Sequence, residues 1–165
     1  MPLMQLTTGA LDAGAVLDEV AREVERVHGG PGACGALASF VGVVRRENAG
    51  RRVTRVEYEA YESLAIKVLT RIGVEAGEGW PGSVLAVHHR LGSLAPGEIS
   101  VVIGVAATDR ADAFAACRYA AERVRQVAPI WRRERFDDGV TSLEGATADP
   151  DDTAARLEAR KRACE

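Results

Sequence analysis

The chain has 165 residues, 47% of them hydrophobic and 27% charged, a composition that fits one globular domain with a substantial core. Its net charge is −3, whereas general nucleic-acid-binding proteins normally have an excess of basic residues. No apolar run approaches the roughly 20 residues that a membrane helix needs. Three cysteines without a CxxC spacing argue against a disulfide framework and a zinc site. The N-terminus also lacks the pattern of a signal peptide. We therefore expect a soluble, cytoplasmic domain.

Hydrophobic spacing predicts three amphipathic helices. In the first, Val16, Val20 and Val24 recur at helical intervals between Asp12, a suitable N-cap, and a Gly-Gly stop. Pro129 prevents the third helix from continuing. The helices are expected at 12–28, 64–76 and 110–128, with a further helix from 152 in a polar C-terminal tail.

Segments rich in β-branched residues or alternating in polarity predict strands. They lie at 4–8, 35–46, 52–61, 83–92, 98–108 and 130–136. The turn sequence "SLAPGE" indicates that 83–92 and 98–108 form an antiparallel pair. We predict an α+β fold in which helices pack against one face of a largely antiparallel sheet. A single domain is expected over 1–148, followed by a tail at 149–165.

Three features that are often functional have a structural interpretation here. The glycine-rich "GGPGACG" precedes a strand, so no helix N-terminus is available for a phosphate. His88 and His89 are neighbours on a strand and point to opposite faces, which prevents them from chelating one metal ion. Cys117 lies on the apolar face of the third helix, where a buried thiol is expected, although a persulfide carrier remains an alternative.

Arginines gather at the ends of the predicted elements, beside apolar sequence. They are Arg45, Arg46, Arg110, Arg125, Arg132 and Arg133. One interpretation is a solvated basic surface. The other is a pocket for a carboxylate or phosphate group, which guanidinium groups bind at two points.

Five stretches that include these arginines resemble, in order, the large catalytic subunit of molybdopterin synthase, the MoaE family. They are "GALASFVGVVR" with "RENAG", "VEYEAYESLA", "VHHRLGSLAPGE", "VAATDRADAFAACRYAAERVR" and "APIWRRE" with "FDDG". Together they cover 35–139, nearly two-thirds of the chain.

The resemblance implies an α/β hammerhead-type fold and a homodimer within a heterotetramer. The partner would be a small ubiquitin-like sulfur carrier whose Gly-Gly C-terminus bears a thiocarboxylate. Sulfur would pass from it to cyclic pyranopterin monophosphate, and two transfers would make the dithiolene of molybdopterin. The resemblance implies no metal or other cofactor, no nucleic acid and no membrane.

The family's site maps onto residues spread along this chain. Catalysis would fall to Arg125 and Arg132, which occupy the positions of two family lysines. Substrate binding would involve both of these residues together with Val43, Val44, Arg45, Asp109, Arg110, Arg133 and Glu134. Asp109 stands where the family has histidine, and a tryptophan that often follows "DG" is absent.

These replacements leave a second hypothesis open. Arginine keeps the positive charge of lysine but does not act as an amine nucleophile or proton shuttle near neutrality. If the family lysines act electrostatically, the chain is an active sulfurtransferase. If one of them must transfer a proton, the chain is an impaired paralogue that binds the carrier without turnover.

Overall fold

The computed structural model describes residues 1–165, which form four helices and nine strands. The helices are α1 (Ala13–His28), α2 (Glu62–Gly79), α3 (Arg110–Val127) and α4 (Thr153–Ala163). The strands are β1 (Met4–Thr7), β2 (Ala36–Val43), β3 (Glu47–Asn48), β4 (Arg51–Ala60), β5 (Val84–Arg90), β6 (Gly92–Leu94), β7 (Ile99–Ala107), β8 (Ile130–Phe136) and β9 (Thr141–Glu144). None of the helices is both long and apolar enough to cross a membrane.

The strands form two sheets. The large sheet, so called because its strands contain more residues, has four strands in the order β1-β5-β7-β2, and its only parallel pair is β1 with β5. The small sheet has five strands: four run in the order β3-β4-β8-β9, and β6 also pairs with β4, all antiparallel. The predicted α+β class with a largely antiparallel sheet is confirmed, as is the antiparallel pairing of β5 with β7.

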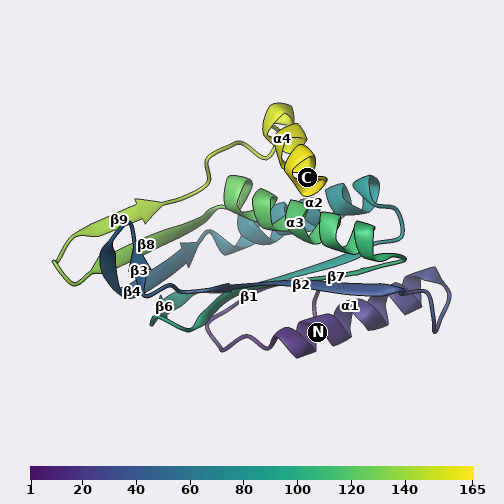
Figure 1. Ribbon diagram of the computed structural model, residues 1–165, viewed down its shortest axis with the longest axis horizontal. Coiled ribbons are helices and arrows are strands. Elements are labelled where there is room, and N and C mark those ends of the chain that lie inside the picture. The colour runs from purple at the N-terminus through teal and green to yellow at the C-terminus, as the bar shows by residue number, and fades with distance from the viewer.

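The prediction that helices cover one face of the sheet is wrong. Val102 and Ala106 of β7 pack with α1, whereas Ile103 and Val105 belong to the core shared with α2 and α3. Figure 1 shows the large sheet between α1 on one side and α2 and α3 on the other. The reason lies in the sequence of β7, whose near-continuous apolar run is typical of a strand buried on both faces.

Local chemistry explains the ends of α1. The Asp12 carboxylate accepts hydrogen bonds from the backbone N–H groups of Gly14 at 2.8 Å and Ala15 at 3.2 Å. At the other end Gly29 adopts a left-handed conformation with φ of 102°, which glycine reaches without a Cβ clash. Both predicted helix boundaries are confirmed.

Two of the connections between the sheets shape the junction where they meet. The first follows a β-bulge at Gly42, where a Cβ would lie 2.6 Å from Cγ1 of Val101. The second is the turn at Ala128 and Pro129, which takes the chain from α3 into β8. In Figure 1 the small sheet lies at the end of the large one, and the site is found at the junction between them.

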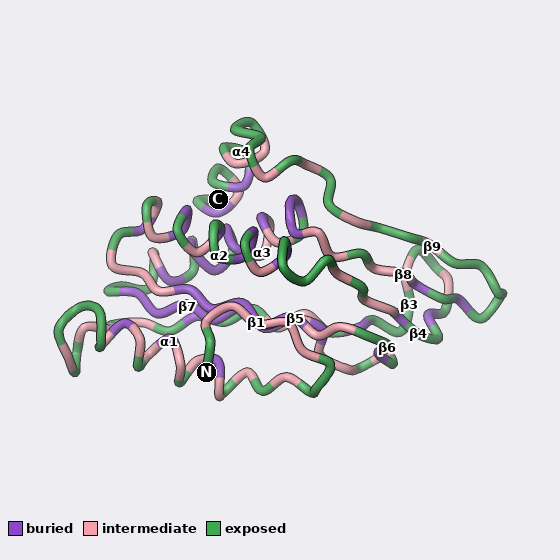
Figure 2. Tube along the Cα trace, turned by 180° about the vertical axis from the view of Figure 1, so that it is seen from behind, coloured by how far each residue is buried: buried purple, intermediate pink, exposed green.

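The C-terminal segment returns to the helical layer. α4 contacts α3, and Ala159 and Ala163 on its inner side are buried (Figure 2). The carbonyl oxygen of Gln126 accepts hydrogen bonds from the N–H groups of Thr147 and Ala148, at 2.8 and 2.9 Å. The residues between β9 and α4 are therefore tied to the end of α3.

Candidate functional site

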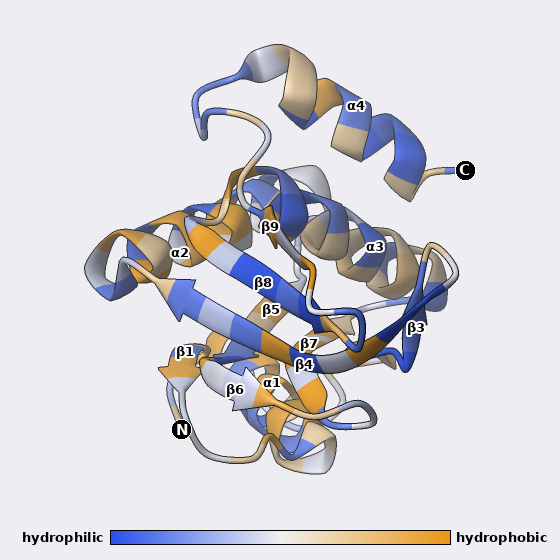
Figure 3. Ribbon diagram, turned by 90° about the vertical axis from the view of Figure 1, so that its left-hand side faces the viewer, coloured by the Kyte–Doolittle hydropathy of each residue, from blue (hydrophilic) through white to orange (hydrophobic).

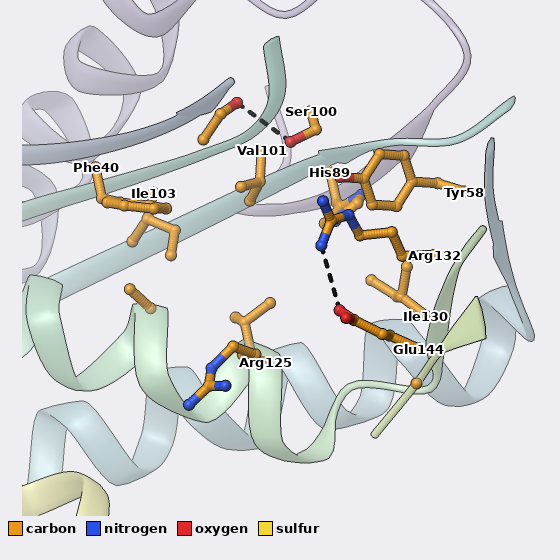
Figure 4. Close-up of a pocket in the computed structure, with 14 residues that line it drawn as sticks. Phe40, Tyr58, His89, Ser100, Val101, Ile103, Arg125, Ile130, Arg132 and Glu144 are labelled. Carbon is orange, nitrogen blue, oxygen red and sulfur yellow. Dashed lines mark hydrogen bonds and ion pairs between the residues drawn. The ribbon is translucent and has the colours of Figure 1, made fainter. Parts of the chain in front are cut away.

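A cavity of about 310 Å³ lies at the junction of the two sheets, beside the C-terminal end of α3 (Figure 4). Its apolar wall includes Phe40, Val101, Ile103, Val124 and Ile130. Its polar lining includes Tyr58, His89, Ser100, Arg125, Arg132 and Glu144. An apolar wall with a few polar groups is the usual composition of a small-ligand site.

Arg132 is the best-organised cation in this cavity. It forms an ion pair with Glu134 on the same strand, and its Nη1 donates to Glu144 Oε2 on β9 at 3.2 Å. Glu134 is 2% exposed, and its carboxylate also accepts a hydrogen bond from Asn48 Nδ2 at 2.5 Å. Because the Glu134 carboxylate is buried and held from two sides, it fixes the position of the Arg132 guanidinium.

Arg125 lines the opposite side of the same cavity. It lies in the last turn of α3, where its 71% exposed side chain makes one long contact of 3.5 Å to Glu122. Figure 4 shows it across the cavity from Arg132. Arg125 is therefore an exposed, loosely held cation, whereas Arg132 is fixed, and the structure places both residues at the same cavity.

Arg45 approaches the cavity indirectly. Its Nη2 donates to Asn48 Oδ1 at 3.4 Å, and Asn48 in turn contacts Glu134. Val44 is buried in the core of the small sheet, and Val43 is 48% exposed at the end of β2. None of these three side chains lines the cavity, although the segment that carries them borders it through Gly42.

Arg133 lies on the other face of β8, because side chains alternate along a strand. It is opposite Glu57 on β4 and Leu143 on β9, away from Arg132 and Glu134. Figure 3 shows the marked hydrophilic character of β8. The neighbouring arginines of β8 therefore lie on opposite faces of the strand, and only Arg132 lines the cavity.

Asp109 and Arg110 are at the far end of α3. The Asp109 carboxylate caps this helix by accepting from the N–H groups of Ala111 and Asp112, at 2.8 and 3.1 Å. Fifteen residues separate Arg110 from Arg125, which corresponds to about 22 Å along a helix. The expectation that Arg110 meets the other arginines in one hollow is therefore wrong within a single copy of the chain.

Four lining residues with polar side chains were not predicted as part of the site: Tyr58, His89, Ser100 and Glu144. Tyr58 and His89 stack edge to face with ring centroids 5.0 Å apart, and the Ser100 hydroxyl donates to the Gly42 carbonyl oxygen at 3.2 Å. The alternation of β4 and β5 places these side chains at the junction, but it does not reveal which strand ends meet. Glu144 comes from a strand that the sequence did not indicate.

The alternative chemistries receive no support. No cluster of three or more metal-ligating side chains is present, and the rings of His88 and His89 each contact a backbone carbonyl oxygen. Cys117 is buried, and burial raises the pKa of its thiol to about 11. A thiol that stays protonated at neutral pH is a poor nucleophile or sulfur carrier.

Comparison with known proteins identifies the family. The family model described as MoaE protein matches residues 7–127. The chain belongs to the MoaE family. The match includes Arg45, Arg110 and Arg125 but ends before Arg132, whose place beside the cavity comes from the fold.

Curated relatives and solved structures agree with this assignment. The molybdopterin synthase catalytic subunit of Bacillus subtilis is 46% identical over 105 residues, covering 64% of this chain and 67% of the relative. That of Halalkalibacterium halodurans is 40% identical over 124 residues, covering 75% and 76%. A crystal structure of molybdopterin synthase from Staphylococcus aureus superimposes with a TM-score of 0.78 at 32% identity, covering 88% of this chain and 98% of that one. The MoaE protein of Burkholderia ambifaria gives 0.71 at 34% identity, covering 96% and 99%.

Proposed function

We propose that this chain is the catalytic subunit of a molybdopterin synthase and that the cavity between Arg125 and Arg132 is its active site. The substrate is cyclic pyranopterin monophosphate. The sulfur donor is the C-terminal thiocarboxylate of a small ubiquitin-like carrier ending in Gly-Gly. Two transfers produce the dithiolene of molybdopterin. An enzyme of this kind works in the cytoplasm, within a heterotetramer built on a homodimer of catalytic subunits.

The observation that carries this proposal is that two arginines from different elements, Arg125 on α3 and Arg132 on β8, line one partly apolar cavity. An acyl-sulfur group entering between them meets donors on two sides. Such donors stabilise the negative charge that develops on the carbonyl oxygen during acyl transfer. Because both groups act through charge and hydrogen bonds, arginine can fill positions where relatives carry lysine.

The two arginines have different tasks. Arg132 is held by Glu134 and Glu144, which suits a donor that must already be in position when the acyl group arrives. Arg125 is exposed and loosely held, which suits a cation that closes on the ligand after binding. Arg45 supports this arrangement through Asn48 and Glu134.

Asp109 and Arg110 take part only if a second copy supplies them. Their distance along α3 from Arg125 excludes a shared site within one chain, and a symmetric dimer can bring one helix start to the partner's cavity. Asp109 then orders the start of α3 that carries Arg110, because its carboxylate is already used as the helix cap.

The decisive experiment mixes the purified protein with a thiocarboxylated carrier and cyclic pyranopterin monophosphate and measures dithiolene formation. We expect product, and we expect it to fall at least about a hundredfold in Arg132→Ala, because a desolvated charge contact is worth about 2–5 kcal/mol. Arg125→Lys with Arg132→Lys restores the family's residues and should remain active. The unaltered protein could instead bind the carrier without forming product, while the double lysine variant forms it. That outcome would establish the impaired paralogue.

A further inference from the structure

His89 and Ser100 are the least exposed polar residues of the cavity, each at 6% exposure. His89 lies on β5, where its ring stacks against the edge of Tyr58 (Figure 4). No charged side chain pairs with it. The ring is therefore held by packing and by whatever hydrogen bonds its two nitrogens make.

The tautomer of the ring follows from one contact. Nδ1 lies 2.9 Å from the backbone carbonyl oxygen of Arg90. A carbonyl oxygen only accepts hydrogen bonds, so Nδ1 carries the proton and donates it. In the neutral ring Nε2 then has a free lone pair and can only accept.

Nε2 has no partner in the protein, yet it is not sealed off. The fully buried side-chain polar atoms without a hydrogen bond are Ser83 Oγ and Arg90 Nε, and His89 Nε2 is not among them. Nε2 therefore retains accessible surface although the ring as a whole is buried. His89 also lines the cavity, so a bound ligand lies next to this ring.

The other polar groups around the cavity make this acceptor distinctive. Arg125 and Arg132 can only donate, whereas the Tyr58 and Ser100 hydroxyls can donate as well as accept. Arg132 engages one oxygen of the Glu144 carboxylate, which is charged and largely exposed. His89 Nε2 differs from these groups because in this tautomer it is a neutral, largely buried atom that can only accept. Burial lowers the pKa of His89 to about 4, so the ring stays neutral at physiological pH and its Nε2 stays an acceptor.

We propose that His89 Nε2 accepts a hydrogen bond from an N–H group of the bound ligand and so orients it between the two arginines. This inference rests on the proposed function, which supplies two ligands with such a group. One source is the amide N–H of the carrier's terminal glycine. The other is a ring N–H of the pterin. His89 is accordingly a positioning and specificity residue, distinct from the cations that handle charge.

Two substitutions separate the functions of the two ring nitrogens. In His89→Asn the side-chain amide N–H can replace Nδ1–H and keep the bond to the Arg90 carbonyl, but nothing reaches the place of Nε2. In His89→Gln the longer side chain carries an oxygen acceptor to that place. His88→Gln is the matched control, because His88 is the next residue on β5, is also buried, and contacts Pro2 on the opposite face of the sheet.

Steady-state kinetics and the affinity of each ligand are measured for all three variants, with thermal unfolding to confirm the fold. We expect His89→Asn to raise the KM for one ligand about three- to tenfold, the loss of one hydrogen bond. His89→Gln should recover most of this loss, and His88→Gln should not change that KM. The ligand whose KM rises identifies the N–H donor. Equal KM values in His89→Asn and the unaltered protein would overturn the inference.

A second measurement needs no substitution. The chain has three histidines, so the imidazole nitrogens of ¹⁵N-histidine-labelled protein can be assigned with His28 and His88 as references. The unprotonated Nε2 resonance of His89 should move upfield when the donating ligand is added. Product formation with an unmoved Nε2 resonance would overturn this inference alone. Failure of both ligands to bind would overturn the proposed function and this inference with it.

Discussion

Arg132 donates a hydrogen bond of 3.2 Å to the carboxylate of Glu144, and this contact spans two neighbouring strands at the cavity. Glu144 is 62% exposed, whereas the second carboxylate on Arg132, that of Glu134, is buried. The guanidinium thus has one permanent partner and one that solvent, or an incoming anion, can replace.

Replacing Glu144 should strengthen binding of the carrier. The negatively charged chain end of the carrier competes with Glu144 for Arg132, so Glu144→Gln removes the competitor while Glu134 still fixes the guanidinium. Because exposed ion pairs contribute little, we expect the KM for the carrier to fall about two- to fivefold with kcat nearly unchanged. Steady-state kinetics at low ionic strength measure this.

Glu158→Gln is the control for the Glu144 experiment. Glu158 is also about half exposed and paired with an arginine, Arg162 at 3.0 Å, but it lies on α4 away from the cavity. Its replacement should leave the KM for the carrier unchanged. A higher KM in Glu144→Gln would mean that the carboxylate helps to bind the ligand, which contradicts the competition described here.

The sequence was sufficient for most of the fold because its elements follow local rules. The cap at Asp12, the stop at Gly29 and the break at Pro129 each act within a few residues, and the structure confirms them. The placement of α1 opposite α2 and α3 depends on contacts such as that of Gly104 with Val16, where a Cβ would lie 3.0 Å from Cγ1. Contacts between residues so far apart along the chain leave no periodic signal.

The helical layer contains a buried ion pair that should dominate stability. Arg123 is fully buried and contacts Glu75 on α2, with its Nε 3.1 Å from Oε2, and Tyr119 donates to the same carboxylate oxygen at 2.7 Å. Arg123→Met leaves the Glu75 carboxylate buried without its main partner. We expect a loss of about 3–5 kcal/mol in the free energy of unfolding, measured by urea denaturation.

Two further variants test the cause of that loss. Arg123→Met combined with Glu75→Leu removes both charges and should recover most of the stability. Arg71→Met removes the exposed partner of Glu75 and of Asp151, and should cost less than about 1 kcal/mol. An equal loss in Arg71→Met and Arg123→Met would show that burial is not what makes the pair important.

The histidine in the cavity predicts a pH dependence of stability. Burial lowers the pKa of His89 from 6.5 to about 4 in the folded state, so protonation favours the unfolded chain. Stability should therefore decrease as the pH falls from about 6.5 towards 4, by about 2 kcal/mol between pH 7 and pH 5. Urea denaturation of His89→Gln should show a smaller decrease than the unaltered protein.

The buried neighbour His88 contributes to the same pH window. Burial lowers its pKa as well, so a decrease of the same sign remains in His89→Gln. Burial opposes ionisation of the Glu75 carboxylate, but hydrogen bonds from Arg123 and Tyr119 outweigh burial and hold its pKa below 4.5. The contribution of Glu75 to stability is therefore lost only at lower pH, outside the window in which the histidines titrate. Identical pH slopes in His89→Gln and the unaltered protein would contradict the assignment to His89.

The site was predicted less completely than the fold. Arg125 and Arg132 were found because an apolar segment flanked by arginines is visible in the sequence. Asn48 and Glu144 were missed because short polar segments of β3 and β9 carry no hydrophobic pattern. Only the pairing with β4 and β8 brings Asn48 to Glu134 and Glu144 to Arg132. Arg110 and Arg133 were grouped with the site because charge and chain position say nothing of the direction in which a side chain points.

The position of Arg110 leads to a test of a shared site between two copies. If a partner's Arg110 completes the cavity that contains Arg132, Arg110→Ala and Arg132→Ala should each be inactive alone. In a mixed dimer, one of the two sites then combines an intact Arg132 with an intact Arg110 from the partner. Random assembly makes half of the dimers mixed, so co-expression should restore about a quarter of the unaltered activity.

Co-expressed Arg125→Ala and Arg132→Ala should restore none, because both residues line the cavity of the same chain. Full activity of Arg110→Ala alone would remove Arg110 from the site, and restoration in the Arg125 control would show that Arg125 and Arg132 act in different sites.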